Sequence, residues 1–262
     1  MLPGDLSAQT PLADERLTDG ERIELQVYFK WGLLMPKAGK AVMAVGKSQF
    51  RGEEAWEYRL DFQTQGIFEK IFPMRDTLKA YFAEPGRHLL YAEKRSDEGK
   101  YYSVDELTFA YEPGGPTVAH SLRYTPKATK IDTVLQSDGP LLDMLSATMY
   151  LRALDWTRLS IGDAWPFRIA VGRDLVPAAY RYAGQQVVEH GGVKYRTRHF
   201  YVDVHDEAFT QSRAAGEVWI GDDPNHIPVK VRAKLKIGAA EVYFRRASGL
   251  PYPLECAVGG KP

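Results

Sequence analysis

Alternation of apolar and polar residues is the feature that most constrains the fold of this chain. In residues 227–237, six apolar residues occupy the odd positions, and Lys or Arg occupies four of the even positions. Segments 22–31 and 56–62 repeat this period of two. Because successive side chains of a β-strand point to opposite faces, each segment is predicted to be a strand with one solvated face.

The alternation also predicts how these strands pair. Strands of parallel sheets are covered on both faces and are almost continuously apolar, whereas antiparallel sheets commonly leave one face to solvent. Turn signals such as Gly191-Gly192 and the Pro-Gly-Gly-Pro sequence at 113–116 separate the predicted strands. We therefore expect a mainly β protein, a long antiparallel meander that forms a strongly curved sheet or open barrel.

One segment departs from the period of two and predicts a helix over about 140–154. Pro140 suits the first turn of a helix, and the apolar residues that follow recur with helical spacing. We expect this single central helix to pack on the concave face of the sheet, with Leu145 and Met149 buried against it.

The chain is predicted to contain one domain, since no linker rich in Ser, Gly or Pro interrupts it. The β-rich domain is expected over 19–248. The tails at 1–18 and 249–262 contain Pro and Gly without periodicity and are expected to be irregular.

Charge and composition exclude several classes of protein. Lys and Arg number 34, as do Asp and Glu, so the formal net charge is zero and no nucleic-acid partner is expected. The chain lacks an apolar run near the roughly 18 residues of a transmembrane segment. Its single cysteine, Cys256, cannot form an intrachain disulfide or a Cys-based zinc site. Catalytic, nucleotide-binding and metal-binding signatures are also missing, so we expect no catalytic residues, cofactor or metal.

Several short motifs follow one another over about residues 20–246. They are Gly20–Glu24 leading to Trp31 and Ala38–Ala41; Phe72–Asp76; Asp143–Ala147 with Tyr150–Arg152; Gly162-Asp163; and Val218–Asp223 followed by Ile227–Lys230. In their order and spacing the chain resembles the domain-of-unknown-function 3108 family of exported bacterial proteins. The resemblance implies a β protein related to the half-barrels that handle lipoproteins or lipids, and it brings no catalytic residues.

The same resemblance implies a periplasmic or outer-membrane-associated location. A secretory signal has a basic start and an apolar core of about 7 to 15 residues, and Met1–Thr10 shows neither. We therefore expect the sequence to be a mature or trimmed form of an exported protein.

Arg75 and Asp76 form the first candidate ligand-binding site. They follow Pro73, which fixes the backbone where a strand begins, and a guanidinium can present a planar fork to an anion. We expect the pair to lie at the mouth of a cleft. The alternative is a structural ion pair at a corner of the sheet.

The second candidate site joins Trp219 to an acidic turn. Asp222 and Asp223 could bind calcium or act as acid and base, although Asp-Asp-Pro-Asn also suits an exposed turn. Trp31 and Trp219 could stack on sugar rings, or they could fill the core.

Three functions remain open. The first is an exported non-catalytic binding protein of the cell envelope that holds a lipid-like, lipoprotein or glycan ligand in an apolar cleft. The second is a carbohydrate-active hydrolase that uses Asp76 with Asp222 or Asp223. The third is a scaffold that contacts envelope proteins through an exposed basic stripe formed by Lys230, Arg232, Lys234 and Lys236.

Overall fold

The computed structural model describes residues 18–84, 88–112, 114–204, 212–235 and 237–259. In this part of the chain, fifteen strands belong to one sheet and two helices lie outside it. The strands are β1 (Glu21–Lys30), β2 (Lys37–Phe50), β3 (Glu53–Thr64), β4 (Arg75–Ala83), β5 (Leu89–Glu98), β6 (Tyr101–Tyr111), β7 (Thr117–Thr125), β8 (Ala128–Ser137), β9 (Leu141–Leu142), β10 (Ala164–Val171), β11 (Asp174–His190), β12 (Val193–Val204), β13 (Ser212–Gly221), β14 (Pro228–Lys234) and β15 (Ala239–Ser248). The helices are α1 (Ile67–Ile71) and α2 (Ser146–Ala153).

The sheet is a meander whose two halves are joined by its first and last strands. From β1 to β8 each strand pairs antiparallel with the next, as do the strands from β10 to β15, and β15 pairs antiparallel with β1. The short strand β9 pairs parallel with β10. The free edges are therefore β8 and β9. The predicted antiparallel meander is confirmed.

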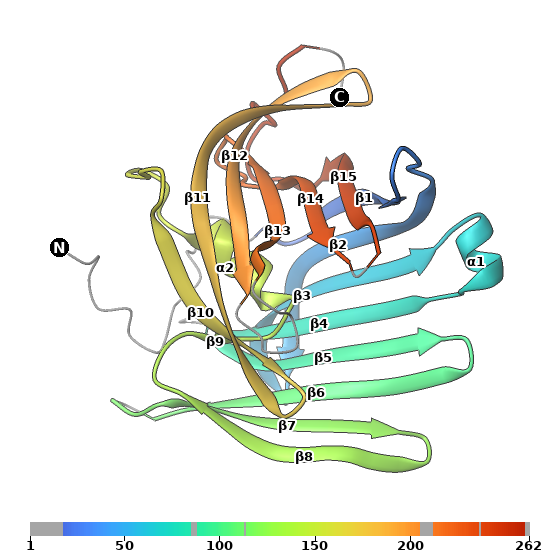
Figure 1. The fold of residues 1–262 in the computed structure, drawn as a ribbon. Coiled ribbons are helices and arrows are strands. Elements are labelled where there is room, and N and C mark those ends of the chain that lie inside the picture. Colours follow the sequence, from blue (N-terminus) through green and yellow to red (C-terminus); the bar gives the residue numbers. More distant parts are fainter. Residues whose placement is uncertain (1–17, 85–87, 113, 205–211, 236, 260–262) are drawn as a thin grey trace.

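The sheet curves until its two ends meet along a seam, which makes it a nearly closed barrel (Figure 1). Across the seam, the Ser121 hydroxyl on β7 donates to the carbonyl of Gly172, at 2.6 Å. The Arg173 guanidinium donates to the carbonyl of Lys130 on β8, at 3.0 Å. The predicted curved sheet or open barrel is thus confirmed in its coarse form.

Alternation along the strands produces the buried core. Between β3 and β4, Trp56 pairs with Phe82 and Tyr58 with Ala80, and all four side chains are buried. The residues between them in sequence face the other side, where Glu57 accepts a hydrogen bond from the Tyr81 hydroxyl at 2.7 Å. The period of two therefore identified the buried face correctly.

The predicted central helix is present, but it is shorter than expected. It spans 146–153 rather than 140–154, because Leu141 and Leu142 pair with β10. The Asp143 carboxylate then accepts hydrogen bonds from the backbone N–H groups of Leu145 and Ser146, both at 2.8 Å. These bonds satisfy free N–H groups at the start of the helix, which therefore begins after Asp143.

Helix α2 lies between strands from both halves of the sheet. The Tyr58 hydroxyl on β3 lies 2.9 Å from the Thr148 hydroxyl, and the Tyr180 hydroxyl on β11 donates to the carbonyl of Ala147 at 2.8 Å. Leu145 and Met149 are buried, at 1% and 2% exposure. The helix is thus in contact with side chains of β3 and β11.

The C-terminal segment, expected to be irregular, is packed against β12. It is irregular in secondary structure, but the backbone N–H of Arg196 on β12 donates to the carbonyl of Cys256 at 2.8 Å. Cys256 is fully buried, and this burial raises the pKa of its thiol. It is therefore a core residue. Residues 1–17 of the predicted N-terminal tail, like 260–262, lie outside the described residues.

Neither helix in the described residues has the length and apolar character needed to cross a membrane.

Candidate functional site

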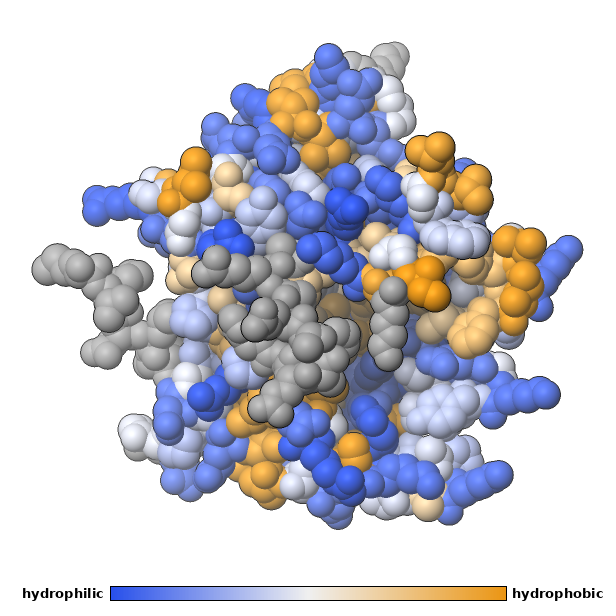
Figure 2. All heavy atoms as spheres, in the orientation of Figure 1, coloured by the Kyte–Doolittle hydropathy of each residue, from blue (hydrophilic) through white to orange (hydrophobic). Residues whose placement is uncertain are grey.

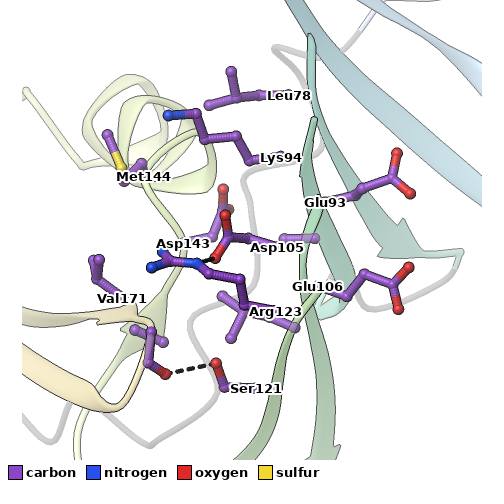
Figure 3. A pocket seen from close by; sticks show the side chains of 14 residues that line it. Leu78, Glu93, Lys94, Asp105, Glu106, Ser121, Arg123, Asp143, Met144 and Val171 are labelled. Atoms are coloured by element: carbon purple, nitrogen blue, oxygen red, sulfur yellow. Dashed lines mark hydrogen bonds and ion pairs between the residues drawn. The ribbon is translucent and has the colours of Figure 1, made fainter. Parts of the chain in front are cut away.

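A pocket of about 120 Å³ opens at the seam of the barrel (Figure 3). The inner face of β4–β7 forms one wall, and the turn after β9 and the end of β10 form the other. We call it the seam pocket. It is lined by Leu78, Ala92, Glu93, Lys94, Asp105, Glu106, Leu107, Ser121, Arg123, Asp143, Met144, Ala170, Val171 and Gly172.

The deeper part of the seam pocket is apolar. Ala92 and Leu107 are buried and directly opposite each other on β5 and β6. Met144 and Val171 come from the facing segments and are 54% and 38% exposed, so they lie toward the opening. Because a methionine side chain is flexible and polarisable, Met144 can adapt its shape to an apolar group that enters.

Charged side chains form the next row on the same wall. Lys94, Asp105 and Arg123 are neighbours across β5, β6 and β7, and they point into the pocket in Figure 3. Arg123 donates a hydrogen bond to Asp105, and the Lys94 ammonium lies 3.4 Å from Asp76. Opposite charges are therefore paired along this wall, and the mouth is polar without a dominant sign.

The carboxylates that line the seam pocket all have partners. Asp105 accepts from Arg123, and buried Asp143 accepts from the backbone at the start of α2. Burial raises the pKa of Asp143, while these hydrogen bonds act in the opposite direction. Glu93 and Glu106 project to the other side of the sheet, where they bind Arg95 and Tyr124.

Arg75 and Asp76, expected to act together, point to opposite faces of β4. Arg75 is exposed and pairs with Glu69 on α1. Asp76 is 8% exposed and faces inward, where it contacts Lys94 and Ser96. Its Oδ1 has no hydrogen-bond partner among the described residues. Asp76 therefore adjoins the seam pocket through Lys94, whereas Arg75 does not.

The second predicted cluster lies at the opposite end of the barrel. Asp222 binds Arg198 at 2.7 Å. Asp223 is buried and accepts from the backbone N–H groups of Asn225 and Cys256, both at 3.0 Å. These bonds are those of a structured turn that holds the C-terminal segment. The structure does not bring Asp222 or Asp223 together with Asp76, which lies on β4 near the other end.

The two tryptophans have different environments. Trp219 is 7% exposed, its ring stacks on His199 at 4.5 Å, and the Lys230 ammonium lies 4.6 Å from its centroid. Its indole N–H donates to Gln186 at 2.7 Å. The ring surface that would stack on a sugar is therefore occupied. Trp31 is 63% exposed, in the turn after β1.

The predicted basic stripe on β14 is not a free surface. Lys230 and Arg232 lie 3.2 and 3.5 Å from the carboxylate of Glu241, which is 2% exposed. Arg232 also pairs with Glu217 at 3.7 Å. Lys234 is exposed, and Lys236 lies outside the described residues. The expected ladder of four exposed cations is therefore wrong for its first two members.

Sequence reasoning missed the polar wall of the seam pocket. Lys94 lies two residues after Ala92 and Asp105 two residues before Leu107, so each shares a strand face with a buried residue. A charge at a core position of an alternating strand is the signal that could have identified this wall. In the described residues, we find no cluster of three or more His, Cys, Asp or Glu side chains suited to a metal ion.

The fold has a counterpart among solved structures. The crystal structure of a β-barrel-like protein of the domain of unknown function DUF1849 from Brucella abortus aligns with a TM-score of 0.60. The alignment covers 89% of this chain and 98% of that chain at 12% identity, so the likeness shows the fold alone. No curated protein has significant sequence similarity to the chain. The family model described as a protein of unknown function, DUF3108, matches residues 24–245, and the chain therefore belongs to the DUF3108 family.

Proposed function

We propose that this chain is an exported, non-catalytic binding protein of the bacterial cell envelope, periplasmic or outer-membrane-associated. Its ligand would be lipid-like, either a free lipid or the acyl part of a lipoprotein, with an apolar segment in the seam pocket. The observation that supports this most is the arrangement of the pocket, in which buried Ala92 and Leu107 lie behind a mouth of paired charges.

The volume limits how much of a ligand the pocket can hold. Sites that enclose a drug-sized molecule have about 300–1,000 Å³. The seam pocket has about 120 Å³. It would therefore hold one apolar segment, while the rest of the ligand lies along the polar mouth beside Lys94 and Arg123.

Two observations favour an apolar ligand over a glycan and a binding role over hydrolysis. Trp219 has no open ring surface for a sugar, and the exposed Trp31 does not line the seam pocket. The pocket carboxylates Asp105 and Asp143 are engaged by Arg123 and by the start of α2, which leaves neither as a free acid or base. The exported location is inferred from the family.

A titration with 11-(dansylamino)undecanoic acid, a fluorescent fatty acid, tests the proposal. The parent protein should increase the emission of the probe. Val171→Trp, which fills the pocket entrance, should weaken binding at least about tenfold. Val187→Trp is the matched control, because Val187 is 62% exposed on β11 and does not line the seam pocket. Equal binding by the two variants would exclude this pocket as the site.

A further inference from the structure

We infer that one end of the barrel is a docking surface for an anionic lipid bilayer. The surface consists of three neighbouring connections at this end: residues 30–37 between β1 and β2, residues 65–75 around α1, and residues 234–239 between β14 and β15. They expose nine large apolar side chains, which we call the apolar rim: Trp31, Leu33, Leu34, Met35, Ile67, Ile71, Phe72, Leu235 and Ile237.

The three connections lie side by side. Their strands are consecutive in the sheet, in the order β4, β3, β2, β1, β15, β14. Two contacts join the first two connections. The centroids of the Phe29 and Phe68 rings are 6.0 Å apart, and the backbone N–H of Gln65 donates to the carbonyl of Ala38 at 2.9 Å. A Cβ on Gly238 would lie 2.2 Å from the carbonyl oxygen of Lys30, so the last connection is packed tightly on the first. In Figure 2, orange groups lie over α1 and the two turns on the right of the view.

The apolar rim is not required by the core. Helix α1 has no buried residue, and Leu33, Ile71 and Ile237 are 105%, 71% and 67% exposed. Contiguous exposed apolar groups of this kind usually mark an interaction site. An exposed tryptophan among aliphatic tips is typical of surfaces that enter the boundary between headgroups and acyl chains.

Charge identifies the partner. The three connections contain six basic residues, Lys30, Lys37, Lys70, Arg75, Lys234 and Lys236, and one acidic residue, Glu69. The whole chain has no net charge, so these three connections carry an excess of positive charge. Arg75 is paired with Glu69 and Lys30 lies 3.9 Å from Glu241, which leaves the remaining lysines among the described residues as the unneutralised cations of this surface. Exposed apolar side chains with lysines beside them complement an anionic membrane surface, because the apolar groups enter the bilayer while the lysines attract its headgroups. A second copy of the chain would bring like charges together, which disfavours dimerisation through this surface.

Flotation of the full chain with two kinds of vesicle tests the proposal. One kind contains phosphatidylcholine alone, and the other contains equal amounts of phosphatidylcholine and phosphatidylglycerol. The parent should float with the anionic vesicles, less so at high salt. The triple variant Leu33→Ser, Ile71→Ser, Ile237→Ser should partition at least about tenfold less. The matched control is Val134→Ser, Ile161→Ser, Val187→Ser, whose residues are also exposed but lie outside the apolar rim. It should bind like the parent.

A second variant tests the charges. Lys37→Gln, Lys70→Gln, Lys234→Gln removes exposed cations and should reduce flotation with anionic vesicles. No flotation of the parent, or equal flotation of parent and apolar-rim variant, would overturn the proposal. So would a dimer, seen by sedimentation, that the apolar-rim variant dissociates without any vesicle binding. Val171→Trp should float like the parent, which separates this surface from the seam pocket.

Discussion

Arg152 on α2 and Glu21 on β1 form a bidentate ion pair in the centre of the molecule, at 2.7 and 2.8 Å. Their side chains are 2% and 1% exposed. Arg152 also donates to the carbonyl of Asn225 at 3.2 Å, and its own carbonyl lies 3.0 Å from the ring of His226. The end of α2 is thus tied to the first strand and to the turn after β13.

Removing one member of this pair should destabilise the protein strongly. Arg152→Met leaves the Glu21 carboxylate buried without its cation, and we expect a loss of about 3–5 kcal/mol in the free energy of unfolding. The double variant Glu21→Leu, Arg152→Met should lose much less. Arg246→Met is the control: Arg246 is paired with Glu24 at 2.8 Å but is 75% exposed, so solvent screens the pair and we expect almost no loss of stability. Urea unfolding would measure all three. Equal losses at the two sites would contradict the role assigned to the buried pair.

Adjacent residues before α2 should respond very differently to truncation. Leu145 is 1% exposed, and Leu145→Ala should cost about 2–5 kcal/mol through lost burial and the cavity left behind. Met144 is 54% exposed, and Met144→Ala should change stability by no more than about 0.5 kcal/mol. Thermal melts followed by circular dichroism would compare them. Similar melting temperatures for both variants would show that the interior packing is not as described.

Two lysines of β14 provide a similar contrast. Lys230 pairs with buried Glu241 and lies over the Trp219 and Tyr243 rings, so Lys230→Gln should cost about 1–3 kcal/mol. Lys234 is exposed, and Lys234→Gln should stay within about 0.5 kcal/mol of the parent. Denaturant midpoints of the two variants test this. If Lys230→Gln left the stability unchanged, Lys230 would belong to an exposed basic stripe that the fold does not require, as the sequence predicts.

Stability should fall in mildly acidic solution. The His190 ring stacks on Tyr243 at 4.3 Å, and burial together with nearby Lys230 lowers the pKa of the imidazole below 6.5. The unfolded state therefore binds the proton more readily, so stability declines as the pH falls below about 6.5.

His190→Gln should reduce this decline. It should not abolish it, because burial also lowers the pKa values of His88 and His199. Urea unfolding of parent and variant between about pH 5.5 and 7.5 tests the sign. An identical pH dependence would contradict it.

The predictions that succeeded rest on local periodicity. The alternation at 56–62 placed Trp56 and Tyr58 on the buried face, and the apolar spacing identified Leu145 and Met149 as core residues. The start of the helix was wrong because β9 pairs with a strand more than twenty residues later, and periodicity within one segment does not contain that pairing.

The sites were harder to predict because each depends on partners that are distant in sequence. Arg75 and Asp76 are adjacent in the chain, yet the pleat directs them to Glu69 and Lys94 on opposite faces. The alternation predicts an exposed Lys230, but the outward face of β14 is partly covered by the Trp219 and Tyr243 rings around it.

Native mass spectrometry of freshly purified protein tests the central claim, a lipid-like ligand in the seam pocket, most directly. We expect the parent protein to retain a bound species with the mass of a lipid or acyl chain, and Val187→Trp to retain it as well. Val171→Trp, with the pocket filled, should be free of it. A parent protein without any bound species, or an adduct that persists equally in Val171→Trp, would contradict the account.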